Sequence, residues 1–485
     1  MNKNNNIYYI LTLAFVLRLL SLHQSFWLDE ATSAGVARDL SLYQILNDFL
    51  PGDFHPAGYY LLLKGWGAVF GFSTVALRLS SVCVGVATVF VVYLIGKTLK
   101  NETLGTLSAL LFATAPLHIY YSQEVRMYSL STLLASLTIY FYLRIQKRPN
   151  KTDWLWFSTF LASNLLIDYL PVLIIIPIWA ATLFGFSKRK AIWKRNFLLS
   201  HVPALLAFGV LWPILKTQLA AGLSVKISSP AWWSLLGTTN FKNIALIPVK
   251  FLIGRISFEN DYVYVLMAVS ALALYVFAFK ETVKKINNYK ILYLWATLPV
   301  IAGVFIGLFI PVLSYFRFLF VLPVVYLLAA LGLTEIKEKY FVPLLFSLFL
   351  LNMTMSYRYL STPKFLREDW RGLATYISED SVFMPSPLVI FPANSQMEAL
   401  KFYNSDGRVQ ISGPDIEIGS QERLYLIRYV VAIFDPEDKV RTKIESNNYQ
   451  KVEEKDFNGI TVWKYEKLPE IPPELELNSE KVIKL

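Results

Sequence analysis

The chain contains few of the residues on which soluble domains and metal-binding modules depend. Only 17% of its 485 residues are charged, whereas soluble globular domains carry about a quarter. Cys83 is the single cysteine, which excludes an intramolecular disulfide and a cysteine metal cluster. No two of the four histidines (His23, His55, His118 and His201) have the spacing of metal ligands on one helix. A soluble domain, a disulfide-stabilised domain and a cysteine-based zinc site are therefore all disfavoured.

Apolar and aromatic residues are abundant instead. Hydrophobic residues make up 55% of the chain, and the mean hydropathy is +0.44. The 28 tyrosines and 12 tryptophans are expected if many rings lie at membrane interfaces. These proportions predict an α-helical polytopic membrane protein.

A membrane-spanning helix needs about 20 mostly apolar residues. No small-residue cleavage site follows the first apolar run, so we interpret it as a retained span and not as a signal peptide. The stretch "LLIDYLPVLII" around Pro171 fits either a tight hairpin or one kinked helix. The sequence predicts eleven spans: 7–22, 75–99, 103–119, 126–145, 153–169, 171–186, 197–215, 261–279, 291–311, 314–333 and 340–357.

Basic loops set the expected orientation. "LRIQKRPNK" (143–151), "SKRKAIWKR" (187–195) and "KETVKKINNYK" (280–290) fall on one side of an eleven-span layout. The positive-inside rule makes that side cytoplasmic and explains much of the net charge of +11 without a nucleic-acid partner. We therefore expect a cell-membrane protein with a cytoplasmic N-terminus, in which loop 23–74 and the segment after residue 357 lie outside.

One loop departs from this pattern. Segment 216–259 falls on the outer side, yet it is rich in cations. Either the span count is wrong near this loop, or the cations meet an anion there. The cations are Lys216, Lys226, Lys242, Lys250 and Arg255.

The last part of the chain changes character and predicts a second domain. Residues 1–357 form the expected transmembrane domain, whereas 358–485 is charged and carries short strand-like runs. An amphipathic helix is expected at 370–377. We therefore predict a small extracytoplasmic α/β domain, with strands within 387–391, 423–434 and 459–465.

Three polar clusters fall on the predicted outer side. They are the pair Asp29–Glu30, the stretch "GDFHPAGYYLLLKGW" (52–66), and the turn "HIYYSQEVRMYS" (118–129). The turn contains Glu124, Arg126 and Tyr128. Because all three clusters face the same side, they can belong to one site.

Each cluster also has an ordinary structural interpretation. Asp29 can start a helix, and His55 with its following proline can form a turn. Glu124 and Arg126 can be a surface ion pair of little energetic value. Arg317 in "SYFRFLF" can extend to the membrane interface. Taken together, these interpretations require four unrelated features to lie on the same side by coincidence.

A single site accounts for all of them. A carboxylate at the membrane surface can remove the proton of a hydroxyl group that arrives from outside. Cations at the same surface can hold a phosphate, which arginine binds with two hydrogen bonds. His55, Arg126, Arg317 and loop 216–259 supply such cations. This combination favours transfer from a lipid-phosphate donor.

The quoted motifs also resemble a known family. The series "WLDEATSAG", "FHPAGYYLLLKGWGAVFG", "ALRLSSVCVGVATVFVVYLIGKTL" and "YYSQEVRMYSL" resembles polytopic glycosyltransferases of the GT-C fold. The branch is the bacterial and archaeal one related to protein O-mannosyltransferases and to the aminoarabinose transferase of lipid A. "YFRFLFVLPVVYLLAALGL" (315–333) and "DWRGLATYI" (369–377) resemble the later part of that branch.

The resemblance implies roles for several residues. Asp29 takes the role of catalytic base. We expect Glu30 beside it, from its position alone, to be a catalytic residue that orients the helix or tunes its neighbour. Glu124 is the acidic residue of the second outer loop that supports the site. The expected substrate-binding residues are His55, Glu124, Arg126, Tyr128 and Arg317.

The resemblance also implies the substrates. The donor is a polyprenyl-phosphate sugar in the bilayer, the acceptor is an extracytoplasmic glycolipid, polysaccharide or protein, and transfer inverts the anomeric carbon. The motif His55-Pro56-Ala57 departs from the His-Pro-Pro of the mannosyltransferases, which weakens any specific inference about mannose or protein acceptors. No cofactor is certain, and Glu30 with Glu124 leaves a divalent cation open.

Two other functions compete with this interpretation. A transporter or flippase for a lipid-linked or anionic solute would carry ionisable residues within its spans and two similar halves. Here the ionisable residues gather at the outer ends and the halves differ, which favours the enzyme. A scaffold for a cell-wall complex would leave the outer acidic residues spread apart.

Overall fold

A computed structural model describes residues 6–380, 387–404, 407–419 and 421–469. The last part of the predicted second domain, 470–485, lies outside the described residues. Internal contacts divide the chain into two compact units. One unit comprises Met1–Gln24 and Ser33–Leu366, and the other comprises Ser25–Thr32 and Arg367–Leu485. The two units are described separately below.

The first unit is helical. Five stretches within the described residues are long and apolar enough to cross a membrane: Thr74–Leu99, Ala191–Ile227, Asp261–Val283, Tyr315–Leu333 and Glu338–Ser361. Shorter apolar helices occupy Asn6–Leu19, Glu102–Ala113, Leu170–Leu183 and Lys290–Ile306. A helix lies over each of the eleven predicted spans, which confirms the helical membrane fold. That all eleven cross the membrane stays a prediction.

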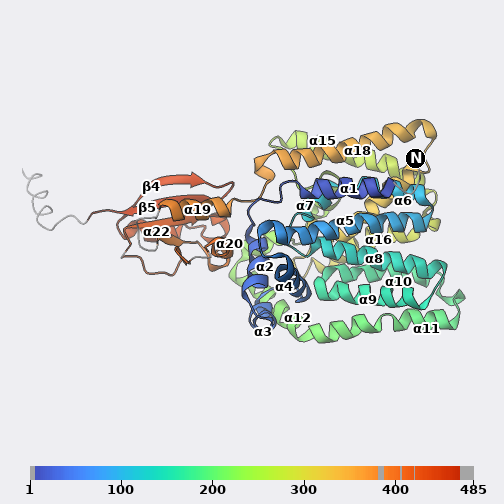
Figure 1. Ribbon diagram of the computed structural model, residues 1–485, viewed down its shortest axis with the longest axis horizontal. Helices are drawn as coiled ribbons and strands as arrows, with labels where there is room; N and C mark the ends of the chain where they lie inside the picture. The colour runs from blue at the N-terminus through green and yellow to red at the C-terminus, as the bar shows by residue number, and fades with distance from the viewer. Residues whose placement is uncertain (1–5, 381–386, 405–406, 420, 470–485) are drawn as a thin grey trace, which may run out of the picture. The chain divides into compact units, whose positions relative to one another are not determined.

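The longer helices of this unit have the following bounds (Figure 1): α1 Asn6–Leu19, α4 Gly58–Phe70, α5 Thr74–Leu99, α6 Glu102–Ala113, α7 Pro116–Tyr121, α8 Tyr128–Lys147, α9 Lys151–Ile167, α10 Ile175–Leu183, α11 Ala191–Leu199, α12 Val202–Ser228, α13 Pro230–Leu235, α14 Phe241–Ile253, α15 Asp261–Val283, α16 Lys290–Ile306, α17 Leu322–Leu333 and α18 Glu338–Ser361. Helix α2, Leu28–Asp39, begins in the second unit and ends in the first.

Short turns and single-turn helices fill the connections. They are α3 Leu42–Gln44, η2 Ile45–Phe49, η3 Leu50–Gly52, η4 Leu170–Ile174, η5 Phe186–Lys188, η6 Ile286–Asn288, η7 Tyr315–Val321 and η8 Pro363–Phe365.

The segment around Pro171 contains two helical stretches and not one continuous helix. Helix α9 ends at Ile167, and the next residue, Asp168, has extended backbone angles. A 3₁₀ turn then begins at Leu170 and leads into α10. Proline restricts the residue before it and lacks an amide hydrogen, so a new helix begins here more easily than the old one continues.

Successive helices reverse direction and pack against one another. Helix α5 contacts α6 and α8, and α8 contacts α9; Figure 1 shows α5, α8 and α9 side by side. Short connections therefore alternate between two ends of the bundle. Segments 33–73, 114–127 and 168–174 lie at one end, and 148–150 lies at the other.

Small residues and one buried cation allow this close packing. A Cβ atom on Gly332 of α17 would lie 1.7 Å from the carbonyl oxygen of Ala278 on α15. Arg18 of α1 is fully buried, and its guanidinium donates to the Ala113 carbonyl at 2.9 Å and to Nδ1 of His118 at 2.7 Å. These contacts hold α1 against the end of α6 and against α7.

The second unit is built on a five-stranded sheet with the order β2-β1-β3-β5-β4. The pairs β1–β2 and β1–β3 are parallel, and the pairs β3–β5 and β4–β5 are antiparallel. The strands are β1 Leu388–Ile390, β2 Gln410–Ser412, β3 Arg423–Arg428, β4 Tyr449–Asp456 and β5 Thr461–Lys467. The helices are α19 Trp370–Asp380, η9 Asn394–Gln396, α20 Glu398–Tyr403, α21 Val431–Phe434 and α22 Lys439–Ser446.

The predicted α/β character of this unit is confirmed, with three differences in detail. Strand β2, Gln410–Ser412, was not predicted. The predicted strand 423–434 ends at Arg428, because Val430 has a positive φ of 52° and a short helix follows. Strand β4 escaped prediction, since "YQKVEEKD" has the polar composition of an exposed edge strand.

The short segment 25–32 is tied to this unit by specific contacts. The backbone N–H of Phe26 donates to the Tyr403 hydroxyl at 2.7 Å, and the Phe26 ring packs edge-on to Phe402 at 5.2 Å. The backbone N–H of Arg371 donates to the Ser25 hydroxyl at 3.0 Å. These contacts fix the start of helix α2, where Asp29 and Glu30 lie.

Candidate active site

The predicted catalytic pair occupies the first turn of α2, and its two members have different surroundings. Glu30 is fully buried, and its Oε2 accepts a hydrogen bond from Nε of Arg367 at 2.8 Å. The Arg367 side chain is only 2% exposed. The backbone carbonyl of Arg367 accepts a hydrogen bond from the Asn458 side-chain amide at 2.8 Å. Asp29 is half-buried. Glu30 is thus one half of a buried ion pair, whereas its neighbour reaches the surface of the unit.

Arg367 is a residue that sequence reasoning missed. It lies in "FLREDW", directly before the quoted element "DWRGLATYI". A lone arginine in a charged stretch reads as a surface residue, so its sequence carries little signal of burial. Only the fold reveals that it pairs with Glu30.

In the first unit, Asp53 forms the first of a series of contacts among the predicted binding residues. Its Oδ2 accepts hydrogen bonds from the Tyr60 hydroxyl at 2.7 Å and from the His55 backbone N–H at 3.3 Å. Its Oδ1 lies 3.5 Å from Nδ1 of His55. Nε2 of the same ring accepts from the Arg126 guanidinium at 3.4 Å. Because a guanidinium can only donate, the imidazole proton belongs on Nδ1, facing Asp53.

The environment of Asp53 keeps it ionised. Burial opposes the charged form, but the electrostatic interaction and hydrogen bond with His55, the hydrogen bond of Tyr60 and the charge of Arg126 outweigh it. Together they lower the pKa of the Asp53 carboxyl to about 2. Asp53 therefore provides a constant negative charge behind His55.

Arg126 connects the contacts around Asp53 and His55 to helix α2 and to a group of aromatic rings. Its Nη1 donates to the Ser33 hydroxyl at 3.2 Å, and its guanidinium lies 6.0 Å from the centre of the Tyr128 ring. The Tyr128 ring packs edge-on to Phe316 at 5.3 Å. Arg126 thus contacts helix α2 and His55 of the first outer loop. Tyr128 packs against Phe316, the residue that precedes Arg317.

A second carboxylate, Asp168, completes the cluster and was also missed. It is buried and close enough to His55, Arg126 and Arg317 to interact electrostatically with each. Arg317 also donates to the Pro311 carbonyl. The signal was present as a carboxylate within the apolar stretch "LLIDYLP", where an ionisable residue usually has a function.

Glu124 has a neighbouring but separate set of partners. It is buried, its carbonyl accepts from the Ser81 hydroxyl at 2.6 Å, and its carboxylate interacts with the charge of Arg255. Arg255 donates to the Tyr120 hydroxyl and lies 4.9 Å from the centre of that ring. One cation of the exceptional loop 216–259 therefore does meet an acidic residue.

The five predicted binding residues all lie in the first unit. His55 contacts Arg126, and Arg126 lies over Tyr128. Arg317 joins them through Asp168, and Glu124 interacts with the charge of Arg255. Within the part of the chain that the structure describes, no three His, Cys, Asp or Glu side chains are grouped to hold a metal ion. The geometry suits binding of an anion beside a cluster of tyrosines.

A family model named dolichyl-phosphate-mannose-protein mannosyltransferase matches residues 54–215. This stretch contains His55, Glu124, Arg126 and Tyr128. None of the curated proteins matches the chain in sequence.

Two solved structures share the fold over nearly the whole chain. The structure of ArnT from Cupriavidus metallidurans in the apo state is similar with a TM-score of 0.58 and 12% identity, covering 95% of this chain and 97% of that one. The same protein bound to undecaprenyl phosphate gives a TM-score of 0.56 and 11% identity, with 95% and 97% covered.

The oligosaccharyltransferase AglB from Archaeoglobus fulgidus, in complex with an inhibitory peptide and a dolichol-phosphate, gives a TM-score of 0.53 and 12% identity. The match covers 96% of this chain and 75% of that one. The chain is thus similar to a mannosyltransferase family model over residues 54–215 and shares the fold of ArnT and AglB, as the predicted GT-C fold requires.

Proposed function

We propose that this chain transfers a sugar from a polyprenyl-phosphate donor to a hydroxyl group of an extracytoplasmic acceptor, with inversion and with Asp29 as general base. The donor lies in the bilayer, and the acceptor arrives from the outer side. The polyprenyl phosphate named in the ArnT and AglB structures supports this donor class.

The observation that carries the proposal is the hydrogen bond from Arg126 to Ser33. Ser33 and Asp29 are four residues apart on helix α2, and such residues share one helix face. Arg126, the residue proposed to bind the donor phosphate, therefore contacts the part of helix α2 that belongs to the first unit.

The reaction needs one base and a stabilised leaving group. The acceptor oxygen attacks the anomeric carbon while its proton passes to Asp29. The bond between that carbon and the phosphate oxygen breaks, and its electron pair leaves with the polyprenyl phosphate. Arg126 and Arg317 stabilise the charge that develops on the phosphate. Two flanking acids, as in glycoside hydrolysis, are not required.

The other residues position these groups. Asp53 fixes the tautomer of His55, so that Nε2 accepts from Arg126. Asp168 balances the positive charge between Arg126 and Arg317. Glu30 anchors the first turn of α2 through its ion pair with Arg367.

The test compares two substitutions on the same helix. Asp29→Asn keeps size and a hydrogen-bonding oxygen but removes the base. We expect it to bind the donor normally and to lose about 10²–10⁴-fold in turnover. Asp39→Asn removes the same charge at the far end of α2, where Asp39 pairs with Arg38 at the surface, and should retain activity.

The assay is the initial rate of sugar transfer from a matched polyprenyl-phosphate sugar by purified protein in nanodiscs, with donor affinity measured in parallel. Near-normal turnover by Asp29→Asn would reject the base assignment. In that case Asp29 would be better explained as the residue that starts helix α2.

A further inference from the structure

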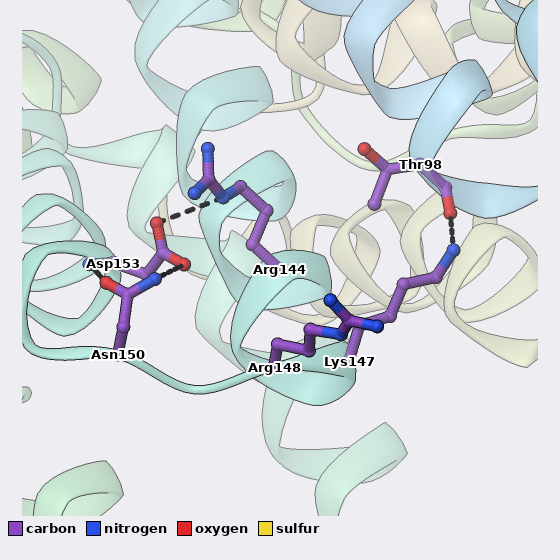
Figure 2. A pocket seen from close by; sticks show the side chains of 6 residues that line it. All are labelled: Thr98, Arg144, Lys147, Arg148, Asn150 and Asp153. Atoms are coloured by element: carbon purple, nitrogen blue, oxygen red, sulfur yellow. Dashed lines mark hydrogen bonds and ion pairs between the residues drawn. The ribbon is translucent and has the colours of Figure 1, made fainter.

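A second polar site lies at the other end of the helix bundle. A cavity of about 570 Å³ opens where α5 and α8 end and α9 begins (Figure 2). Helix α8 has 20 residues and a rise of about 1.5 Å per residue, so its far end lies roughly 30 Å from the predicted donor site. The lining residues are Thr98, Arg144, Lys147, Arg148, Asn150 and Asp153.

The cavity carries excess positive charge. Asp153 is its single acidic lining residue, and Figure 2 shows this carboxylate already engaged. Nε of Arg144 lies 3.0 Å from Oδ1 of Asp153, and the Asn150 amide donates to Oδ2 at 2.6 Å. Lys147 donates to the Thr98 carbonyl, and no carboxylate among the described residues forms an ion pair with it.

Arg148 is the available group. Its side chain is exposed, and within the described ranges no acceptor or carboxylate partner is found for it; in Figure 2 no dashed line reaches it. An arginine fork of this kind matches the paired oxygens of a phosphate.

The surface beside the cavity is apolar and aromatic. Phe141 of α8 stacks on Phe160 of α9 at 5.7 Å, and Trp156 stacks on Phe160 at 5.5 Å. Trp156 is 43% exposed and its neighbour Leu155 is 62% exposed. The Arg144 guanidinium lies 5.8 Å from the Phe141 ring centre, so this aromatic strip continues directly into the basic cavity.

We propose that the cavity binds the phosphate headgroup of an anionic phospholipid, with Arg148 and Lys147 on the phosphate and the acyl chains along the aromatic strip. Basic pockets between helix ends bind such headgroups. A soluble phosphate would use the cations but would gain nothing from the strip, which favours the lipid. This site is independent of the proposed sugar transfer.

The test uses the full chain in detergent micelles, with phosphatidylglycerol or phosphatidylcholine added and bound lipid counted by native mass spectrometry. Arg148→Gln removes the unpaired cation without breaking any described contact. Its apparent affinity for phosphatidylglycerol should fall about five-fold, while its melting temperature in phosphatidylcholine should match that of the unmodified chain. Arg148→Lys keeps the charge and should lose less.

Lys151→Gln is the matched control, because it removes one positive charge three residues away, outside the cavity lining. It should retain the affinity of the unmodified chain. An equal loss in Lys151→Gln would overturn the proposal, since the attraction would then come from the diffuse charge of the loop.

Two further measurements identify the source of the phosphate. Trp156→Ala should weaken phosphatidylglycerol retention, because it shortens the aromatic strip. Millimolar inorganic phosphate should not displace the lipid. Full retention by Trp156→Ala together with displacement by phosphate would overturn the lipid assignment in favour of a soluble anion.

Discussion

At the scale of single residues, Glu30 and Arg367 form the most deeply buried ion pair described above, with side chains 0% and 2% exposed. Removing one partner of such a pair leaves the other charge buried, which typically costs about 3–5 kcal/mol. We expect Glu30→Gln to lower the unfolding temperature strongly, while the activity per folded molecule falls less than in Asp29→Asn. Thermal unfolding and turnover, measured on the same preparations, separate the two effects.

The double substitution Glu30→Met with Arg367→Met is the control for this prediction. It removes both charges and keeps apolar volume, so much of the lost stability should return. If the double variant is no more stable than Glu30→Gln, the attraction between the two charges stabilises the fold beyond the volume that the side chains fill.

Asp53 leads to a prediction about pH. Its pKa is about 2 in the folded chain and about 3.9 when unperturbed, so its ionised form stabilises the fold above about pH 4. The stabilisation is lost as the pH falls through about 2 and amounts to roughly 2 kcal/mol. Asp53→Asn should therefore unfold at a lower temperature than the unmodified chain at pH 7, and the gap should narrow at pH 3.

Asp48→Asn gives the comparison, because Asp48 is an exposed acid of the same outer loop. Its unfolding temperature should follow that of the unmodified chain at both pH values. A gap for Asp53→Asn that stays constant between pH 7 and pH 3 would count against the ionic role of this carboxylate.

At the scale of helices and strands, close packing of α15 against α17 depends on Gly332. A methyl group there would lie 1.7 Å from a backbone oxygen that cannot rotate away, so Gly332→Ala must push the helices apart. We expect a loss of about 1–3 kcal/mol, measured by unfolding in detergent. Gly209→Ala on α12 meets no atom within 4 Å and should be neutral or slightly stabilising, since alanine favours helix.

The same scale shows what the sequence could predict. The long apolar runs form helices, because a segment in lipid must satisfy its own backbone hydrogen bonds. The strands at 388–390 and 461–467 lie within predicted strand runs, apart from the last two residues of 461–467. Strand β4 could not be predicted, because an edge strand exposes charged side chains and lacks apolar alternation. The turn at Asp168 stayed ambiguous, since a proline permits both a kink and a break.

The candidate site was predictable only in part for a related reason. Motif residues such as His55 and Arg126 stand out by their type and spacing. Asp53 lies two residues before His55 in the quoted stretch 52–66, but Asp168 comes from a distant segment, as does Arg367, the partner of Glu30. Nothing in a single sequence indicates which distant acid will face which cation.

At the scale of the whole molecule, the predicted orientation rests on where the uncompensated cations lie. The basic loops 143–151, 187–195 and 280–290 share one side in the eleven-span layout. The cation-rich loop 216–259 is weaker evidence against this orientation than its composition indicates. Burial and the charge of Arg255 lower the pKa of Lys250 to about 8, and Arg255 itself interacts with Glu124 and Tyr120. Lys250 donates to the Ile256 carbonyl and Arg255 donates to the Tyr120 hydroxyl, so both cations have partners within the protein.

Single cysteines in a Cys83→Ser background test this orientation with an impermeant maleimide on intact cells. Lys284→Cys replaces a 73% exposed side chain in a basic loop and should be labelled only after permeabilisation. Lys401→Cys in the second unit, 46% exposed, and Asp48→Cys in the first outer loop should be labelled without it. Labelling of Asp48→Cys only in permeabilised cells would place the proposed base on the cytoplasmic side, where an extracytoplasmic acceptor could not reach it, and the orientation and the acceptor assignment would both fail.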